Sequence, residues 1–233
     1  MTRNSIELLS PAKSKDHAKA AINAGADAVY IGGPSFSARA VASNSYDDIA
    51  EVVRYAHLFG AKVYVALNTI LTDEEVQQAL DMASTLYDIG VDALITQDFS
   101  LVQLKRQGRM PQIPIHASTQ MNNRTPEKVK FLENCGFEQV VVARESSLDQ
   151  IREIAKESSV RLETFIHGAL CVCYSGQCYL SERLMNRSAN RGECAQPCRL
   201  PYSLEDADGK LSGEAAFDIV YRSVQGELNA VRK

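Results

Sequence analysis

The chain lacks most of the features that assign a protein to a class directly. Its 233 residues contain no apolar run close to the roughly 18 residues of a membrane span, and MTRNSIELLSPAKSKDHAK contains no stretch of signal-peptide length. The net charge of −4 gives no overall basic field, although a local basic patch would suffice for a nucleic-acid partner. We therefore expect a soluble, cytoplasmic protein with no membrane partner. Its cysteines would stay reduced and favour metal binding over disulfides.

Several catalytic motifs are also missing. No GxGxxG follows the first expected strand, which lowers the expectation of a Rossmann fold. The HExxH and GxSxG motifs of many hydrolases are absent. The cysteines form neither a CxxC pair nor the paired CxxC of a zinc ribbon.

Instead, short apolar runs typical of strands alternate along the chain with longer segments in which apolar residues recur at helical spacing. The segments NAGADAVYIG, LFGAKVYVAL, DIGVDALITQ and NCGFEQVVVA share a glycine followed shortly by a strand. A glycine just past a helix adopts the left-handed conformation and lets the chain enter the next parallel strand. Seven such units favour a barrel over an open doubly wound sheet. We predict an α/β fold, a TIM-like (β/α) barrel with units one to seven in residues 1–170 and the eighth missing or truncated.

The expected strands and helix starts follow from this pattern. Ser14, Ser45, Thr72 and Thr125 are the expected helix N-caps, and a further helix is expected from Ser147 to Lys156. After Tyr202, one further segment (217–221) reads as a strand, so we expect residues 203–233 to be a divergent, truncated tail. The seven expected strands are Ile6–Leu9, Asp27–Ile31, Lys62–Leu67, Asp92–Thr96, Pro114–Ala117, Gln139–Ala143 and Arg161–Ile166.

Chemistry in a parallel barrel is located at the carboxyl ends of the strands. His116 and His167 each follow an apolar strand, and in an extended strand Glu163 shares a face with His167. A single histidine there is more often structural, but two beside a carboxylate make catalysis equally plausible. Glu163, His167 and His116 are therefore the candidate catalytic residues. The other polar positions at this end are Ser10, Gly32, Gly33, Arg39, Asn68, Gln97, Asp98, Ser118, Thr119, Gln120, Arg144 and Glu145, of which Asn68, Gln120 and Arg144 are the candidate substrate-binding residues.

Five of the six cysteines fall in residues 171–198. Cys135 precedes a glycine at a helix end and is expected to pack against the core. The spacing C-x6-C-x15-C-x3-C favours an iron–sulfur cluster, with zinc or unliganded thiols as the alternatives. Cys173, in an extended segment beside Cys171, is expected to point the other way. The expected metal ligands are therefore Cys171, Cys178, Cys194 and Cys198, in a cysteine-rich loop at residues 171–202.

Four arginines lie in the same stretch. They form either a solvated charged loop or a basic rim for a phosphate or carboxylate of the substrate. The candidate substrate-binding residues of this set are Arg187 and Arg191; the others are Arg183 and Arg199.

HGALCVCYSGQCYLS and ANRGECAQPCRLPY resemble the peptidase U32 family, as do ELLSPA, GADAVYIGGPSFSAR, GAKVYVALNTIL, GVDALITQD and HASTQ. The resemblance covers residues 6 to about 209, and it is strongest to the branch that hydroxylates ribosomal RNA. It implies a TIM-like barrel with a [4Fe-4S] cluster, and hydroxylation of a base in ribosomal or transfer RNA. In the tRNA-acting members the resemblance also implies prephenate as a co-substrate. The family's cluster ligands fall on Cys171, Cys178 and Cys194, with Cys198 as the fourth.

Three functions stay open from the sequence. The first is an iron–sulfur RNA hydroxylase, and the second is a collagenase-like peptidase, as the family label says. A peptidase would need a free Cys171 or Cys178 beside His167, which ligation to a cluster would prevent. The third is a non-catalytic or inactive fragment with a metal site. It is suggested because family members continue with segments similar to LLSxKDL and FKIEGR, which this chain lacks.

Overall fold

The computed structural model describes residues 6–38, 43–168 and 170–200. Within these ranges seven parallel strands form one sheet in the order β1-β2-β3-β4-β5-β6-β7. The strands are β1 (Leu9–Ala12), β2 (Ala28–Gly32), β3 (Lys62–Leu67), β4 (Ala93–Thr96), β5 (Ile115–Ala117), β6 (Gln139–Val141) and β7 (Arg161–Glu163). The helices between them are α1 (Lys15–Asn23), α2 (Tyr46–Leu58), α3 (Val76–Ile89), α4 (Phe99–Arg106), α5 (Pro126–Cys135) and α6 (Leu148–Glu157).

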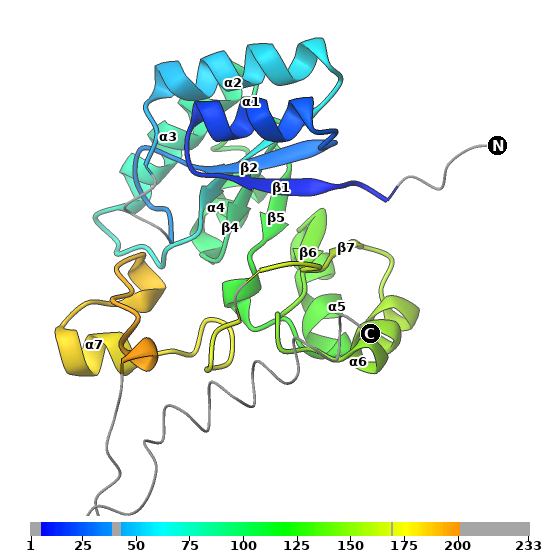
Figure 1. Ribbon diagram of the computed structural model, residues 1–233, viewed down its shortest axis with the longest axis vertical. Helices are drawn as coiled ribbons and strands as arrows, with labels where there is room; N and C mark the ends of the chain where they lie inside the picture. The colour runs from blue at the N-terminus through cyan, green and yellow to red at the C-terminus, as the bar shows by residue number, and fades with distance from the viewer. Residues whose placement is uncertain (1–5, 39–42, 169, 201–233) are drawn as a thin grey trace, which may run out of the picture.

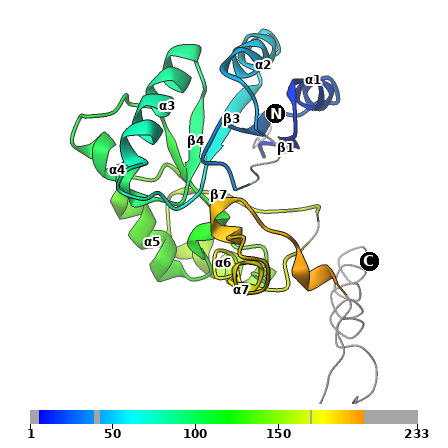
Figure 2. The same cartoon turned by 90° about the vertical axis from the view of Figure 1, so that its left-hand side faces the viewer.

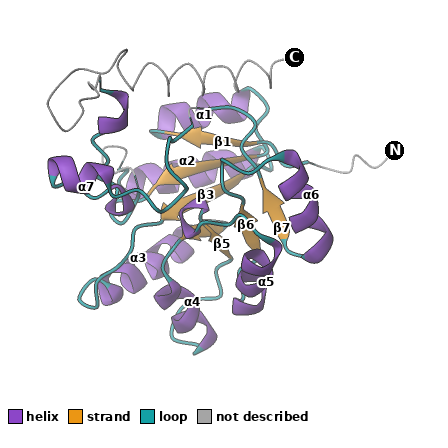
Figure 3. Ribbon diagram, turned by 90° about the horizontal axis from the view of Figure 1, so that it is seen from below, coloured by secondary structure: helices purple, strands orange, loops and turns teal. Residues whose placement is uncertain are grey.

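The order of neighbours follows the order of the chain, as in a barrel wound in one direction. The sheet curls, and Figures 1 and 3 show the helices arranged around the strands. The predicted α/β fold with seven barrel units is confirmed, as a curled and open half-barrel. Residues 203–233, with the expected strand at 217–221, and Arg39 lie outside the described residues. No helix in the described ranges is long and apolar enough to cross a membrane.

Most of the expected helix ends are confirmed. The hydroxyls of Ser45, Thr125 and Ser147 each accept a hydrogen bond from the backbone N–H three residues on. Gly90 and Gly136 end α3 and α5 at φ values of 94° and 101°, in the left-handed region that glycine permits. These two glycines therefore end their helices and also make the turns that lead into β4 and β6.

Two helix starts differ from the prediction. Ser14 occupies the N-cap of α1, but its hydroxyl pairs with Nδ1 of His17 at 2.9 Å instead of capping the backbone. Helix α3 begins at Val76 because residues 73–75 form a turn. The Thr72 N–H donates to the Glu75 carboxylate at 2.8 Å, which is one half of the expected capping box.

The two edge strands also differ from the prediction. Strand β1 begins at Leu9, and Ile6 is 92% exposed. Pro11 fits in β1 because an edge strand needs only one hydrogen-bonded neighbour. Strand β7 stops at Glu163, which pairs with the last residue of β6, Val141, so that no partner extends the ladder further. The expected continuation to residue 166 was wrong for this reason.

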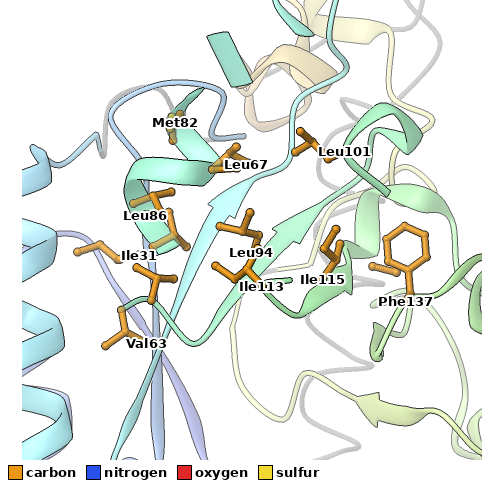
Figure 4. Packing of buried hydrophobic residues seen from close by; sticks show 14 of the residues in the cluster. Ile31, Val63, Leu67, Met82, Leu86, Leu94, Leu101, Ile113, Ile115 and Phe137 are labelled. Atoms are coloured by element: carbon orange, nitrogen blue, oxygen red, sulfur yellow. The ribbon is translucent and has the colours of Figure 1, made fainter. Parts of the chain in front are cut away.

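The hydrophobic core lies between the sheet and its helices, where Ile31, Leu67, Leu86, Leu94 and Ile115 are fully buried (Figure 4). The inner face of the sheet carries a smaller apolar cluster: Ala28, Tyr64, Ala93 and Ile95, with Leu9 and Tyr30 against it. Beyond that cluster the inner face becomes polar. Register places Ile95 beside His116 and His116 beside Gln139, so the polar side chains gather toward β5, β6 and β7.

Candidate active site and metal centre

His116 lies on the inner face of β5 and is 1% exposed. Its ring packs edge-on against the ring of Tyr64, with centroids 4.7 Å apart. Among the described residues neither ring nitrogen has a hydrogen-bond partner. Burial, and to a smaller extent the charge of Arg161, lower the pKa of His116 to about 4. The imidazole is therefore neutral at neutral pH and keeps one free donor and one free acceptor.

Glu163 is the last residue of β7 and is half-buried. Its Oε2 accepts a hydrogen bond of 2.8 Å from Nε2 of Gln139 on the neighbouring strand. Burial raises the pKa of Glu163 to about 7, against the opposing effect of that hydrogen bond, and the charge of Glu7 adds to the rise. A carboxyl group that titrates near neutral pH is suited to general acid–base chemistry.

A carboxylate that the sequence did not single out completes this inner face. Glu7 accepts a hydrogen bond from the Tyr64 hydroxyl at 2.7 Å and forms an ion pair with Lys62 at 2.9 Å. The alternation of side chains along β3 and β6 is the signal that could have identified Tyr64 and Gln139 as inward-facing.

His167 does not join these residues on a strand. Because β7 ends at Glu163, residues 164–167 are exposed and extend past the sheet. The expectation that His167 and Glu163 share one strand face was wrong. The catalytic role of His167 stays a prediction that its position does not support.

The rim amides link loops to one another. Asn68 accepts from the Ala38 N–H at 2.8 Å and donates to Oγ of Ser118 at 3.3 Å. Gln97 donates to the carbonyl oxygens of Asn68, at 2.8 Å, and Asn190, at 3.0 Å. Asn68 is therefore committed to holding the rim together, and its substrate-binding role stays a prediction.

Gln120 and Arg144 keep unused hydrogen-bonding capacity. Among the described residues, Oε1 of Gln120 and Nε of Arg144 are buried without a partner. The Arg144 guanidinium lies 5.6 Å from the centroid of the exposed Phe165 ring. Buried polar atoms without a protein partner are uncommon, and a bound ligand or water satisfies them in many proteins.

The cysteine-rich segment contains α7 (Leu180–Met185) and two short 3-10 helices, η3 (Ala189–Arg191) and η4 (Pro197–Arg199). In Figures 1 and 2 it lies at the opposite end of the molecule from α1 and α2. Arg187 is exposed just after α7. Two contacts with the barrel rim, called here the first and second docks, hold the segment in place.

The first dock is made by residues 174–176. The backbone N–H and the hydroxyl of Ser175 donate to the two carboxylate oxygens of Glu145, at 2.9 and 2.8 Å. The Arg124 guanidinium stacks on the Tyr174 ring at 3.8 Å. Gly176 has a φ of 75°, and a Cβ there would lie 1.7 Å from the backbone oxygen of Gln120. Only glycine allows so close an approach.

The second dock is made by residues 190–192. The Arg191 guanidinium donates to the Ile70 carbonyl at 2.6 Å and to both carboxylate oxygens of Glu75, at 2.6 and 3.1 Å. This fork lowers the pKa of Glu75 to about 2. A Cβ on Gly192 would lie 2.3 Å from the Ser37 backbone oxygen. The fork also borders an open, polar cavity of about 360 Å³ at the ends of β2 and β3.

Two internal hydrogen bonds close the segment on itself. The Arg199 guanidinium donates to the Leu170 carbonyl, which joins the residue after Cys198 to the residue before Cys171. The Ala195 N–H donates to the buried hydroxyl of Ser181 at 2.9 Å. Cysteines that lie far apart in the sequence are therefore near one another in space.

The thiols interact electrostatically. Burial raises the pKa of Cys198; the neighbouring Arg199 lowers it, and Cys194, Cys171 and Cys178 raise it. The pKa of Cys173 is also raised, chiefly by burial and then by Cys178, whose thiol is its hydrogen-bond partner. The expectation that Cys173 points away from the other cysteines was wrong, because residues 172 and 173 form a bend instead of an extended segment and Cys173 interacts with Cys178 and Cys171.

This donor set fits a thiophilic metal centre by its chemistry. All five cysteines of the segment are free thiols, and soft thiolates select iron–sulfur clusters or zinc. Among the described residues, no three histidine, cysteine, aspartate or glutamate side chains are already placed to enclose a metal ion. The thiols thus lie in one region of the structure but do not yet surround a metal position. The ligand set Cys171, Cys178, Cys194 and Cys198 stays a prediction.

The fold and the site together define a class: a (β/α) half-barrel with a polar inner face and a cysteine-rich segment docked on its rim. Residues 13–226 match the family described as Peptidase family U32. The chain belongs to peptidase family U32, as the motifs predicted.

Curated relatives include RNA-modifying proteins and a collagenase. The chain is 56% identical over 206 residues to the 23S rRNA 5-hydroxycytidine C2501 synthase of Escherichia coli, covering 88% of this chain and 31% of the relative. It is 39% identical to the tRNA hydroxylation protein P1 of Bacillus subtilis, over 87% of this chain and 48% of the relative. It is 34% identical to a collagenase of Porphyromonas gingivalis, over 91% of this chain and 53% of the relative. The chain thus spans between about a third and a half of the length of these relatives.

A solved structure supports the fold. The U32 peptidase Mk0906 matches with a TM-score of 0.57 at 17% identity, over 70% of each chain. At that identity the likeness concerns the fold alone.

Proposed function

We propose that the chain is the barrel portion of an enzyme that hydroxylates a base in RNA, with ribosomal RNA as the first candidate and transfer RNA as the second. The observation that carries this is the 56% identity, over 88% of the chain, to a protein named as an rRNA hydroxycytidine synthase. The relative named as a tRNA hydroxylation protein supports the same reaction on the other RNA class. The proposed setting is the cytoplasm, where both RNAs are found.

The proposed cofactor is a [4Fe-4S] cluster held by Cys171, Cys178, Cys194 and Cys198. When bound, such a cluster supplies one-electron redox chemistry at the barrel rim. Cys173 interacts with Cys178, but in this proposal it is not one of the four cluster ligands. Prephenate is the proposed co-substrate, because the resemblance to tRNA-acting family members implies it.

The inner-face residues would handle the base and its protons. Glu163 has a pKa of about 7 and can accept or release a proton at its carboxyl oxygen. Neutral His116 can donate through one ring nitrogen and accept through the other. The free Oε1 of Gln120 can accept a hydrogen bond from an unstacked base, and the free Nε–H of Arg144 can donate to the base or to its phosphate. Exposed Arg187 can bind a phosphate outside the site.

The cluster is tested by purifying the protein without oxygen and measuring iron and visible absorbance. We expect about four irons per chain and a broad absorbance from the cluster. A Cys194→Ala variant should lose both, while a Cys135→Ala variant, in which the changed residue packs against the core, should keep them. An iron-free protein with no absorbance would refute the cluster.

Peptidase activity is the second candidate, favoured by the collagenase relative. It would require a thiol of the cysteine-rich segment to act as a free nucleophile. Incubation of the metal-free protein with gelatin tests it directly. Cleavage that disappears in Cys171→Ala or Cys178→Ala would favour this function over RNA hydroxylation.

A further inference from the structure

The two docks are placed next to the cysteines in the chain. The first dock (residues 174–176) lies between Cys173 and Cys178, and the second (residues 190–192) ends two residues before Cys194. In each dock a glycine packs directly against backbone atoms of the rim. A charged side chain then fixes the contact: the Glu145 carboxylate in the first dock and the Arg191 guanidinium in the second. Their rim partners lie far apart in sequence, at Gln120 and Glu145 for one dock and at Ser37, Ile70 and Glu75 for the other.

The anchors have strong hydrogen-bond geometry. Glu145 accepts two hydrogen bonds from one residue, and Ser175 is only 2% exposed, so that water cannot replace the carboxylate readily. Arg191 makes a two-pronged contact with a carboxylate and a third hydrogen bond to a carbonyl. All of these contacts are made by the polypeptide alone and need no metal.

We propose that Glu145 and Arg191 are positioning residues for the metal centre. They fix the two halves of the cysteine-rich segment on the rim in the metal-free protein, so that metal binding requires only a local movement of the thiols. This inference rests on the proposed thiolate metal centre and adds residues that do not touch the metal. Groups of this kind, which orient the ligands, typically contribute about 10-fold to 100-fold in metal affinity.

Cobalt(II) titration of the reduced, metal-free protein, without oxygen, tests the proposal. The readout is the visible absorbance of cobalt bound to thiolates, from which a Kd is obtained. We expect Glu145→Gln and Arg191→Lys each to raise the Kd about 10-fold, and Glu145→Ala more, because alanine removes both acceptors. Glu145→Gln keeps the shape of the side chain but removes its charge and one of the two acceptor oxygens, so that both contacts with Ser175 become weaker neutral hydrogen bonds.

Control variants come from exposed pairs on α6. Glu153→Gln and Arg152→Lys alter an i,i+3 ion pair with Lys156 and Asp149, respectively, and should leave the Kd unchanged. Far-ultraviolet circular dichroism and urea unfolding verify that each variant keeps the barrel fold. Hydrogen exchange in the metal-free wild type gives a second readout: the amide of Ser175 should be protected, and Glu145→Ala, which removes its acceptor, should remove the protection.

The outcomes separate this inference from the proposed function. If Cys194→Ala and Cys198→Ala bind cobalt as the wild type does, the thiolate metal centre itself is refuted. If the cysteine variants weaken binding but the Glu145 and Arg191 variants do not, Glu145 and Arg191 are not positioning residues. A Ser175 amide that exchanges in the metal-free wild type as in an unfolded chain would equally exclude this role for Glu145. Weaker binding in both sets, with loss of amide protection in Glu145→Ala, supports the proposal.

Discussion

Replacing Glu163 with glutamine removes a half-buried titratable carboxyl group while keeping the side chain's shape. Glutamine still offers an oxygen to Nε2 of Gln139, so the hydrogen bond across β6 and β7 can persist. Because folding raises the pKa of Glu163 from 4.5 to about 7, the folded state holds a proton that the unfolded chain releases. The wild type therefore has the full stabilising effect of this group below pH 4.5 and loses it as pH rises through 7.

The size of the effect follows from the proton affinity. A tenfold change in proton affinity is worth about 1.4 kcal/mol, so a rise from 4.5 to about 7 corresponds to at most about 3.5 kcal/mol. The side chain is half-buried and water reaches part of it, so we expect about 1–2 kcal/mol.

Urea unfolding from pH 4.5 to 8.5 measures this effect. The free energy of unfolding of Glu163→Gln, minus that of the wild type, should increase by about 1–2 kcal/mol over this range. Because the other titrating groups are the same in both proteins, their contributions cancel in this difference. Glu153→Gln, at a 59% exposed carboxylate, should show no such trend. A flat difference for Glu163→Gln would refute a raised pKa and, with it, the acid–base role proposed for this residue.

Three further changes test other parts of the structure. Because folding lowers the pKa of His116 to about 4, the wild type should lose stability as pH falls from 6.5 toward 4; His116→Gln should lack that loss in urea unfolding. Gly176→Ala would place a Cβ 1.7 Å from the Gln120 backbone oxygen, so we expect about 2–4 kcal/mol of destabilisation or detachment of the first dock, seen as hydrogen exchange at residues 171–180. Cys198→Ala should abolish iron binding and Cys173→Ala should leave it intact, as iron content per chain; retention by the first variant would exclude Cys198 as a ligand.

The winding of the barrel could be predicted from local signals. Glycines such as Gly90 and Gly136 lie where a helix must stop and a parallel strand begin, and both adopt the left-handed conformation there. The ends of the edge strands could not be predicted in this way. Whether β7 continues past Glu163 depends on its neighbour, β6, which ends at Val141. Apolar residues beyond that point, such as Phe165, therefore remain outside the sheet.

The candidate site was predictable in part. The cysteine spacing and the family motifs identified the segment, and the polar ends of β5 and β7 identified His116 and Glu163. The two docks depend on contacts between backbone atoms far apart in the sequence, such as Gly176 with Gln120, and no local pattern encodes them. Arg191 was expected to bind substrate, but its guanidinium is occupied by Glu75, a pairing visible only after folding.

Nucleoside analysis of cellular RNA is the direct test of RNA base hydroxylation by this protein. The gene for the protein is deleted in its host, and ribosomal and transfer RNA are digested to nucleosides and compared by mass spectrometry. One hydroxylated nucleoside, heavier than its parent by a single oxygen atom, should disappear on deletion. The wild-type gene should restore it, and a gene carrying Cys194→Ala should not. An unchanged set of nucleosides in both RNA classes would contradict RNA base hydroxylation as the function of this protein.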